Sequence, residues 1–347
     1  MQNFWTKLNK PFFCLAPMAD VTDAAFRTVI SKYGKPDVMW TEFVSADGLM
    51  SAGRNILLRD LEYNENERPI VAQLFSSNPD KMEGAAALVQ ELGFDGLDIN
   101  MGCPDKTIEK QCSGAAMIKN PKLAIDIIRA AKRGAPNLPI SVKTRLGYNK
   151  IEIESWLPEL LKEDLAALTV HLRTRKEMSL VPAQWEIMPK IVEMRDRLAP
   201  NTLIIGNGDV TDLEDARKKS EVSGCDGVML GRAIFGNPWL FSAKEHFPKS
   251  MNNFLLKIFS ARASRAVQGS SKYVPSLKEK LLVLIEHTNL FEEKFKGFKS
   301  FAVMKKHYKA YVNGFDGAKE LRVKLMETEN AGEVEKIIKD FLVDNKI

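Results

Sequence analysis

Eight short apolar runs, each followed by turn signals and a segment of helical period, constrain the fold more than any other feature of this chain. This alternation predicts a parallel sheet whose strands are joined by helices, and eight such strands close naturally into a (β/α)8 barrel, a TIM barrel. The one long gap, between the fourth and fifth runs, must hold a loop and a helix. The expected strands are residues 12–16, 38–41, 70–74, 96–99, 140–144, 167–171, 203–206 and 227–230.

Most of the unusual polar and small residues follow these runs directly. In a barrel, the carboxyl ends of the strands form the active site, so these residues converge on one mouth. An open doubly wound sheet also carries residues at its strand ends, but it does not bring all eight ends together. The residues concerned are Pro17, Met18, Glu42, Gln73, 100–103, 143–145, 171–173, 207–209, Gly231 and Arg232.

The last third of the chain loses this rhythm. We expect a barrel domain over residues 1–243, a connecting segment over 244–275, and a small all-α domain over 276–347. The last of these should form a separate helical bundle. From residue 244 onward the chain has 20 Lys and Arg against 13 Asp and Glu, whereas the rest has 30 against 32. This excess indicates an anionic polymer partner as readily as it indicates a solvated, lysine-rich helical face.

Several classes of protein are disfavoured. No apolar run approaches the length that spans a bilayer, and the first ten residues lack the apolar core of a signal peptide. The four cysteines form no C-x-x-C pair, have no histidine at zinc spacing, and are too few for a disulfide scaffold. We therefore expect a cytoplasmic protein with free thiols, no membrane segment and no metal.

One cysteine stands in a sharp polar turn. Cys103 follows a strand, lies between Gly102 and Pro104, and has Lys106 close behind it. These neighbours favour a proton donor over a buried structural thiol. Cys14 and Cys225 lie in or beside apolar runs and are expected in the core. The role of Cys112, which lies in the same loop as Cys103, stays open.

Two glycine-containing strand ends come late in the chain. Asn207, Gly208 and Asp209 follow the seventh run, and Gly231 and Arg232 follow the eighth. At this position in a barrel, backbone N–H groups surround a phosphate, and an arginine adds a charge-assisted contact. The pattern predicts a phosphate site, although each glycine also fits a turn that only requires a positive φ.

Basic residues follow the fifth and sixth runs. Lys143 is expected to point at the barrel centre, where a lysine suits the electron-rich edge of a reduced flavin. His171 could bind a cofactor oxygen or phosphate, or be structural. Arg173 and Arg175 at a site mouth suit an anionic substrate or a nucleic-acid backbone.

Together these residues resemble the tRNA-dihydrouridine synthase family over residues 12 to about 325. The most specific match is Asn-Met-Gly-Cys-Pro at 100–104, followed by Lys106, Lys110 and Gly-Ala-Ala at 114–116. The chain departs from the family at Leu172, where a small residue is usual, and in a longer link from about 246 to 275. Further matches are Ala-Pro-Met-Ala-Asp at 16–20, Val-Lys-Thr-Arg at 142–145, His-Leu-Arg-Thr-Arg at 171–175 and Lys-His-Tyr at 306–308.

The resemblance implies a flavin-dependent oxidoreductase that reduces uridine in tRNA, with FMN as cofactor, NADPH as reductant and a monomeric protein. It implies hydride transfer to C6 of a flipped-out uracil, protonation of C5 by Cys103, and a tail that grips tRNA by shape and phosphate. Asn100 and Arg173 would orient the uracil. The implied FMN contacts are Ala16, Pro17, Met18, Gln73, Lys143, His171, Asn207, Gly208, Asp209, Gly231 and Arg232. The implied substrate contacts are Asn100, Lys106, Arg145, Arg173, Lys306 and Arg322.

Two other functions compete with this one. An FMN barrel reductase that acts on a free pyrimidine would share the phosphate site and the lysine, but it gives no reason for a basic helical tail. Deletion of the residues beyond 245 would distinguish the two. A non-enzymatic RNA-binding protein on a retired barrel is opposed by the intact Asn100, Cys103, Lys143 and His171.

Overall fold

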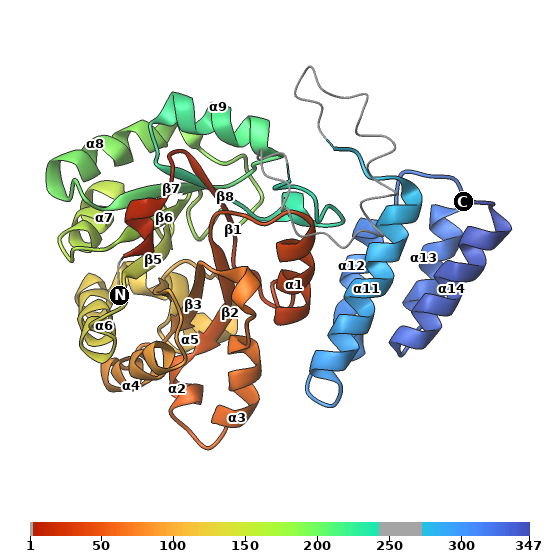
Figure 1. The fold of residues 1–347 in the computed structure, drawn as a ribbon. Helices are drawn as coiled ribbons and strands as arrows, with labels where there is room; N and C mark the ends of the chain where they lie inside the picture. The colour runs from red at the N-terminus through yellow and green to blue at the C-terminus, as the bar shows by residue number, and fades with distance from the viewer. Residues whose placement is uncertain (1–2, 243–272) are drawn as a thin grey trace.

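The computed structural model describes residues 3–242 and 273–347, and it places all eight expected strands in one parallel sheet (Figure 1). Their order around the sheet is β1-β8-β7-β6-β5-β4-β3-β2. A bridge between Cys14 and Val38 joins the two remaining edges, so the sheet closes and the prediction of a TIM barrel is confirmed. The strands are β1 Phe12–Leu15, β2 Met39–Ser45, β3 Ile70–Phe75, β4 Gly96–Asn100, β5 Ile140–Arg145, β6 Ala167–His171, β7 Leu203–Asn207 and β8 Gly227–Leu230.

Helices surround the barrel, and local sequence signals mark their ends. The α4 helix begins at Pro79, where proline suits the first turn, after Asn78 has capped two backbone N–H groups. The α9 helix ends at Gly224, whose φ of 72° suits glycine. The long β4–β5 gap holds a loop and a helix, as expected. The main helices are α1 Ala24–Tyr33, α2 Ala46–Leu49, α3 Arg54–Leu57, α4 Pro79–Glu91, α5 Lys106–Lys110, α6 Pro121–Gly134, α7 Ile153–Leu161, α8 Met188–Leu198 and α9 Leu213–Ser223.

The residues after 276 are helical, as predicted. Ser276 and Glu279 form a capping box that starts the first helix, and positive φ angles at Gly314 and Gly317 turn the chain before the last two. Residues 243–272 lie outside the described residues, so the boundaries of the connecting segment and its longer length stay predictions. The tail contains α11 Leu277–Phe295, the 3-10 turn η7 Phe301–Met304, α12 Lys305–Tyr311, α13 Ala318–Met326 and α14 Ala331–Asp344.

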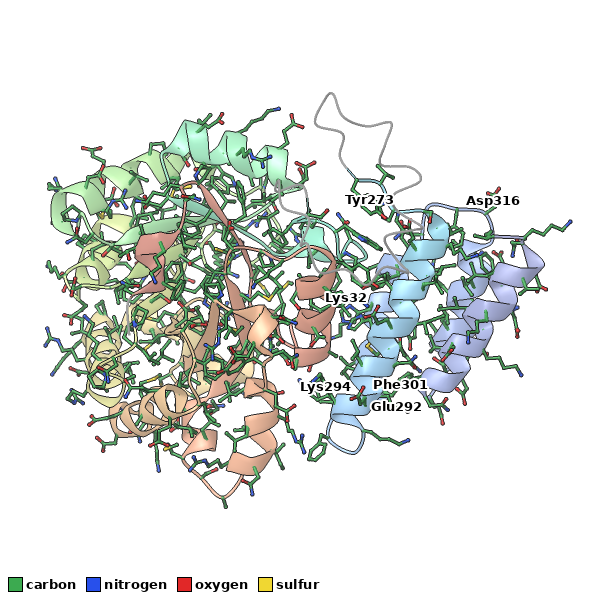
Figure 2. The ribbon with its side chains drawn as sticks, viewed as in Figure 1. Lys32, Tyr273, Glu292, Lys294, Phe301 and Asp316 are labelled. Atoms are coloured by element: carbon green, nitrogen blue, oxygen red, sulfur yellow. The ribbon has the colours of Figure 1, made fainter. Side chains whose placement is uncertain are left out.

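The tail shares its core with the barrel and is not the separate bundle expected from its sequence. Ala25 and Val29 of α1 are fully buried in one apolar cluster with residues of the tail helices. A Cβ added to Gly236 would lie 2.0 Å from the carbonyl oxygen of Ala310 in α12, so the two backbones touch. Figure 2 labels Lys32 on the side of α1 that faces α11, where its Nζ lies 2.6 Å from Oε1 of Glu286. One face of α1 thus completes the tail.

Candidate functional site

The register of the sheet brings the predicted site residues to one level of the barrel. Asn100 of β4 lies opposite Lys143 of β5, Arg145 lies opposite His171 of β6, and His171 lies opposite Asn207 of β7. These residues stand at the carboxyl ends of their strands, where barrel enzymes place their chemistry. The convergence expected from the sequence is therefore present over four consecutive strands.

The cysteine turn is held by backbone hydrogen bonds to a single amide. Oδ1 of Asn100 accepts the N–H groups of Gly102 at 3.1 Å and of Cys103 at 2.9 Å. The Cys103 carbonyl accepts the N–H of Ala115 at 2.9 Å, and the turn closes so tightly that a Cβ on Gly114 would lie 2.7 Å from that carbonyl. The half-buried Cys103 thiol has its pKa raised by burial, so it stays protonated at neutral pH.

A buried carboxylate that received no role from the sequence supports this turn. Asp98 accepts hydrogen bonds from Nε2 of Gln73 and from Oγ of Ser141, both at 2.6 Å. Gln73 in turn accepts Nδ2 of Asn100 at 3.1 Å, which orients the amide that holds the turn. Burial raises the pKa of Asp98 to about 6. Gln73, expected to contact FMN, is fully buried with its amide engaged. A carboxylate inside an apolar strand was the available signal for Asp98.

Arg145 lies beneath the cysteine turn and not at its surface. Its Nε donates to the carbonyl of Gly102 at 2.7 Å, and Nη1 donates to the carbonyls of Thr174 and Met178, both at 3.2 Å. These contacts make Arg145 a support of the turn. Its predicted contact with the substrate stays a prediction.

The two arginines after β6 are each neutralised by a carboxylate, which differs from the expectation that they face an anion. Arg173, with 2% of its surface exposed, forms an ion pair with Asp209 and donates to the carbonyl of Val181 at 2.6 Å. Arg175 forms an ion pair with Glu109 of α5, with 2.8 Å between Nε and Oε1. Arg175 therefore ties the loop of Cys103 to β6, and Arg173 belongs to the group around Asp209.

The predicted phosphate site has free backbone donors. Within residues 3–242 and 273–347, the N–H groups of Gly208, Asp209 and Gly231 donate to no protein atom. Arg232 is 67% exposed, and its Nη2 lies 2.5 Å from Oδ1 of Asp209. Hydrogen bonding from Arg173 lowers the pKa of Asp209, which is therefore ionised and offsets part of the local positive charge. Nδ2 of Asn207 donates to the carbonyl of Met229 at 2.8 Å and links β7 to β8.

The first and last strand ends meet beside this site. A Cβ on Gly231 would lie 3.6 Å from Cβ of Ala16 and 3.7 Å from Sδ of Met18. Ala16 is buried, whereas Pro17 and Met18 are partly exposed. The loop after β1 therefore lies within van der Waals reach of the end of β8. The structure thus groups the implied FMN contacts of β1 with those of the late strands.

At neutral pH the side chain of Lys143 is mostly cationic, whereas the imidazole of His171 is neutral. Lys143 is half-buried, and its Nζ forms no hydrogen bond or ion pair with any described residue. Burial, and next the charge of Arg145, lowers the pKa of Lys143 to about 8, so it stays mostly cationic at pH 7. Burial and the cations Lys143, Arg145 and Arg173 hold the pKa of His171 well below its ordinary value. Nη1 of Arg173 lies 3.1 Å from Nε2 of His171, which assigns the imidazole proton to Nδ1.

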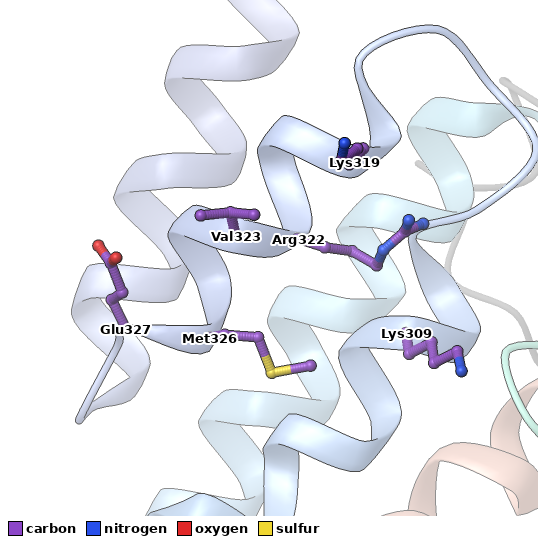
Figure 3. Close-up of a pocket in the computed structure, with 6 residues that line it drawn as sticks. All are labelled: Lys309, Lys319, Arg322, Val323, Met326 and Glu327. Atoms are coloured by element: carbon purple, nitrogen blue, oxygen red, sulfur yellow. The ribbon is translucent and has the colours of Figure 1, made fainter.

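The predicted substrate residues outside the barrel core are spread over a wide surface. Lys106 is the exposed first residue of α5, and Lys306 of α12 lies 3.6 Å from Oδ2 of Asp20. Nη1 of Arg322 donates to the carbonyl of Val312 at 2.7 Å. In Figure 1, α13 and α14 lie on the far side of α11 and α12 from the barrel, so Arg322 is not brought to the mouth. It lines a hollow of about 380 Å³ with Lys309, Lys319, Val323, Met326 and Glu327 (Figure 3).

No group of three or more His, Cys, Asp and Glu side chains in residues 3–242 and 273–347 is arranged to hold a metal ion. No helix in the same part of the chain combines the length and the apolar character needed to cross a membrane.

Comparison with known proteins gives a family match over nearly the whole chain. The model of the dihydrouridine synthase family matches residues 14–346. A Bacillus subtilis protein named "Probable tRNA-dihydrouridine synthase 2" is 40% identical over 345 residues, covering 98% of this chain and 97% of the relative. A Staphylococcus aureus protein named "Probable tRNA-dihydrouridine synthase" is 38% identical over 345 residues, covering 98% and 96%. Among solved structures, morphinone reductase in complex with tetrahydroNAD matches with a TM-score of 0.48 and 14% identity, over 71% of this chain and 90% of that one.

Proposed function

This chain belongs to the dihydrouridine synthase family, and on that premise we propose that it reduces uridine in tRNA to 5,6-dihydrouridine, using FMN as cofactor and NADPH as reductant. The observation that carries the proposal is the turn of Cys103. Asn100 holds a neutral thiol at the level where the strand ends converge. We further expect the protein to act as a monomer in the cytoplasm.

The residues of the mouth fit a flavin mononucleotide. The free N–H groups of Gly208, Asp209 and Gly231, with the exposed Arg232, are the donors that a phosphate monoester requires. Lys143, whose Nζ has no partner within residues 3–242 and 273–347, supplies a cation for the electron-rich edge of the isoalloxazine. His171 offers an Nδ1–H, and Ala16, Pro17 and Met18 provide an apolar wall. FMN, when bound and reduced, would supply a hydride to C6 of the uracil.

Residues of the protein supply the proton that is added at C5 of the uracil. Reduction of the C5=C6 bond adds a hydride at C6 and a proton at C5, and the thiol of Cys103 donates that proton and is left as a thiolate, which water reprotonates. A raised pKa suits this role because the donor must be protonated before the reaction. Asn100 and Arg145 act by holding the turn, and Arg173 acts by holding His171 and Asp209. Direct uracil contacts of these three residues stay predictions.

The tail supplies most of the contacts to tRNA, and Lys106 of the barrel helix α5 adds one. Lys306 and Lys106 are exposed, and the hollow on α12 and α13 gathers Lys309, Lys319 and Arg322 with a single acidic residue (Figure 3). Such surfaces bind the phosphate backbone and not the base sequence, so we expect affinity for tRNA to fall steeply as salt increases.

Mass spectrometry of tRNA nucleosides tests the proposal. Unmodified tRNA incubated with protein, FMN and NADPH should gain two hydrogens on uridine. Cys103→Ala should lower that rate about 1,000-fold, within the range for loss of a general acid, and Cys112→Ala, which removes the exposed thiol of the same loop, should keep it. A protein that binds FMN and consumes NADPH without changing tRNA would contradict the proposal and favour a reductase of free pyrimidines.

A further inference from the structure

A tail lysine inserts between two carboxylates at the rim of the barrel. Lys299 lies between α11 and η7, and its Nζ is 2.7 Å from Oε2 of Glu42 and 2.8 Å from Oδ1 of Asp60. Only 16% of the lysine side chain and 7% of the Glu42 side chain are exposed. Since water screens this pair poorly, it is unlike the exposed ion pairs of the outer helices, which contribute little.

The contact leads from the tail to the loop that follows β1. Glu42 belongs to β2, and while its Oε2 binds Lys299, its Oε1 accepts the backbone N–H of Asp20 at 2.5 Å. Asp20 stands two residues after Met18, which lies against Gly231 at the candidate cofactor site. Lys306 of α12 also approaches Asp20, with 3.6 Å between Nζ and Oδ2. One carboxylate is thus shared by the tail and by the wall of the mouth.

The neighbouring residues extend this contact. Phe298, next to Lys299, carries the guanidinium of Arg59 over its ring at 4.5 Å from the ring centre. Arg59 and Asp60 belong to the same 3-10 turn, η2 Leu58–Leu61, which stands on the barrel side. The loop between α11 and η7 therefore touches the barrel through two consecutive residues.

Within the described residues, Lys299 is the cation that forms an ion pair with Glu42. Burial by itself lowers the pKa of a lysine, yet Glu42 and Asp60 outweigh it and the pKa of Lys299 lies above its ordinary value. Burial raises the pKa of Glu42, and Lys299 opposes that rise. Removing one partner of a buried pair leaves a charge without compensation, which is costlier than losing the pair as a whole.

We propose that Lys299 is a positioning residue that holds the helical tail and the loop after β1 in one fixed arrangement, so that tRNA bound by the tail presents its uridine to the mouth. The substrate in this statement rests on the proposed function, whereas the docking of the tail does not. The predicted consequence is a specific weakening of productive tRNA binding, with the chemistry of the barrel unchanged.

The test compares Lys299→Met with Lys296→Met in the full-length, FMN-loaded protein. Lys296 lies three residues earlier, is 79% exposed, and has its Nζ 3.9 Å from Glu292, so it is a matched loss of one charge. For Lys299→Met we expect the KM for tRNA to rise about tenfold and kcat to stay within about twofold. NADPH oxidation without tRNA should not change. Hydrogen exchange of the α11 amides should accelerate about tenfold. Lys299→Arg, which keeps the charge, should bring both the KM for tRNA and the exchange rate of the α11 amides most of the way back to wild type.

Each outcome decides the question. A Lys299→Met protein whose KM and α11 exchange equal those of Lys296→Met would overturn the proposal. A fall in kcat at unchanged KM would indicate only a smaller folded fraction, and would overturn it as well. If the wild-type protein does not reduce tRNA, the proposed function fails, and the exchange of the α11 amides alone then decides whether Lys299 docks the tail.

Discussion

The polar groups of the barrel mouth and those buried in the helical tail are organised in opposite ways. In the mouth, Asp98, Gln73 and Asn100 form a chain in which each amide or carboxylate has a partner. In the tail, His287 of α11 and His307 of α12 are fully buried, and within the described residues none of their ring nitrogens has a hydrogen-bond partner. The first arrangement orients the turn of Cys103, and the second fills space.

The histidine rings behave as flat, neutral packing groups. Their centroids lie 4.7 Å apart, edge to face, and the ring of Phe26 on α1 lies 5.5 Å from His287 and 5.4 Å from His307. Burial lowers the pKa of His287 to about 3, and it holds the pKa of His307 well below the ordinary value. The comparison teaches that burial of a polar side chain does not by itself indicate a functional role, since the partners of Asp98, Gln73 and Asn100 orient a turn and the buried histidines have none among the described residues.

Among the residues that support the cysteine turn, the largest effect should come from Arg145→Ala. Loss of the Nε contact to the Gly102 carbonyl frees the cysteine turn, and a displacement of about 1 Å at a reacting group costs about 100-fold in rate. The measurement is kcat for tRNA reduction, with FMN affinity as a check on the barrel. Arg129→Ala, which removes an exposed arginine of α6, is the control. A rate for Arg145→Ala within about threefold of wild type would contradict this role.

Gln73→Leu should show what a partnered polar group contributes. The change leaves Asp98 and Asn100 each without one hydrogen bond in a buried site, and we expect the free energy of unfolding to fall by about 2 kcal/mol. Urea denaturation of the FMN-free protein at pH 7 measures it. An unchanged midpoint and slope would mean that the chain of amides is not a support of the turn.

Asp23, which caps α1 between the two regions, should make the free energy of unfolding depend on pH. Burial, and next the carboxylate of Glu42, raises the pKa of Asp23 from 3.8 to about 7. The folded state therefore binds this proton more tightly than the unfolded state, so the stability that it contributes is complete below about pH 4 and is lost as the pH rises through about 7.

Asp23→Asn should remove that dependence, because asparagine caps a helix as well as aspartate does. Between pH 5 and 7, the wild-type protein should lose about 1 kcal/mol of unfolding free energy per pH unit more than the variant. Urea denaturation at the two pH values gives the difference. Parallel losses in both proteins would show that Asp23 is already ionised at pH 5.

The smallest effect is expected from His307→Leu. Because its nitrogens have no partner among the described residues, an apolar side chain of similar volume should leave the free energy of unfolding within about 1 kcal/mol of wild type, or raise it. The same urea experiment as for Gln73→Leu measures the contrast. A loss as large as that of Gln73→Leu would erase the distinction between the two regions.

Patterns within short stretches of the chain were sufficient for the strands and for the cysteine turn. The strand runs carried their own apolar character, and Gly102, Cys103 and Pro104 marked the turn that Asn100 holds. The convergence of strand ends followed from the number of strands, because a closed parallel sheet leaves no other arrangement. The final helices were equally visible, since Ser276, Glu279, Gly314 and Gly317 mark their ends locally.

Only the tertiary structure decided which charges meet. Arg173 and Arg175 were expected to suit an anionic substrate or a nucleic-acid backbone, and the register and the loop path pair them with Asp209 and Glu109. The tail read as a separate bundle, but α1 enters its core. Lys299 and Glu42 stand 257 positions apart, and no local pattern connects them. Hydrophobic period and turn chemistry act over a few residues and are readable in order, whereas ion pairs and shared cores depend on distances that exist only after the chain has folded.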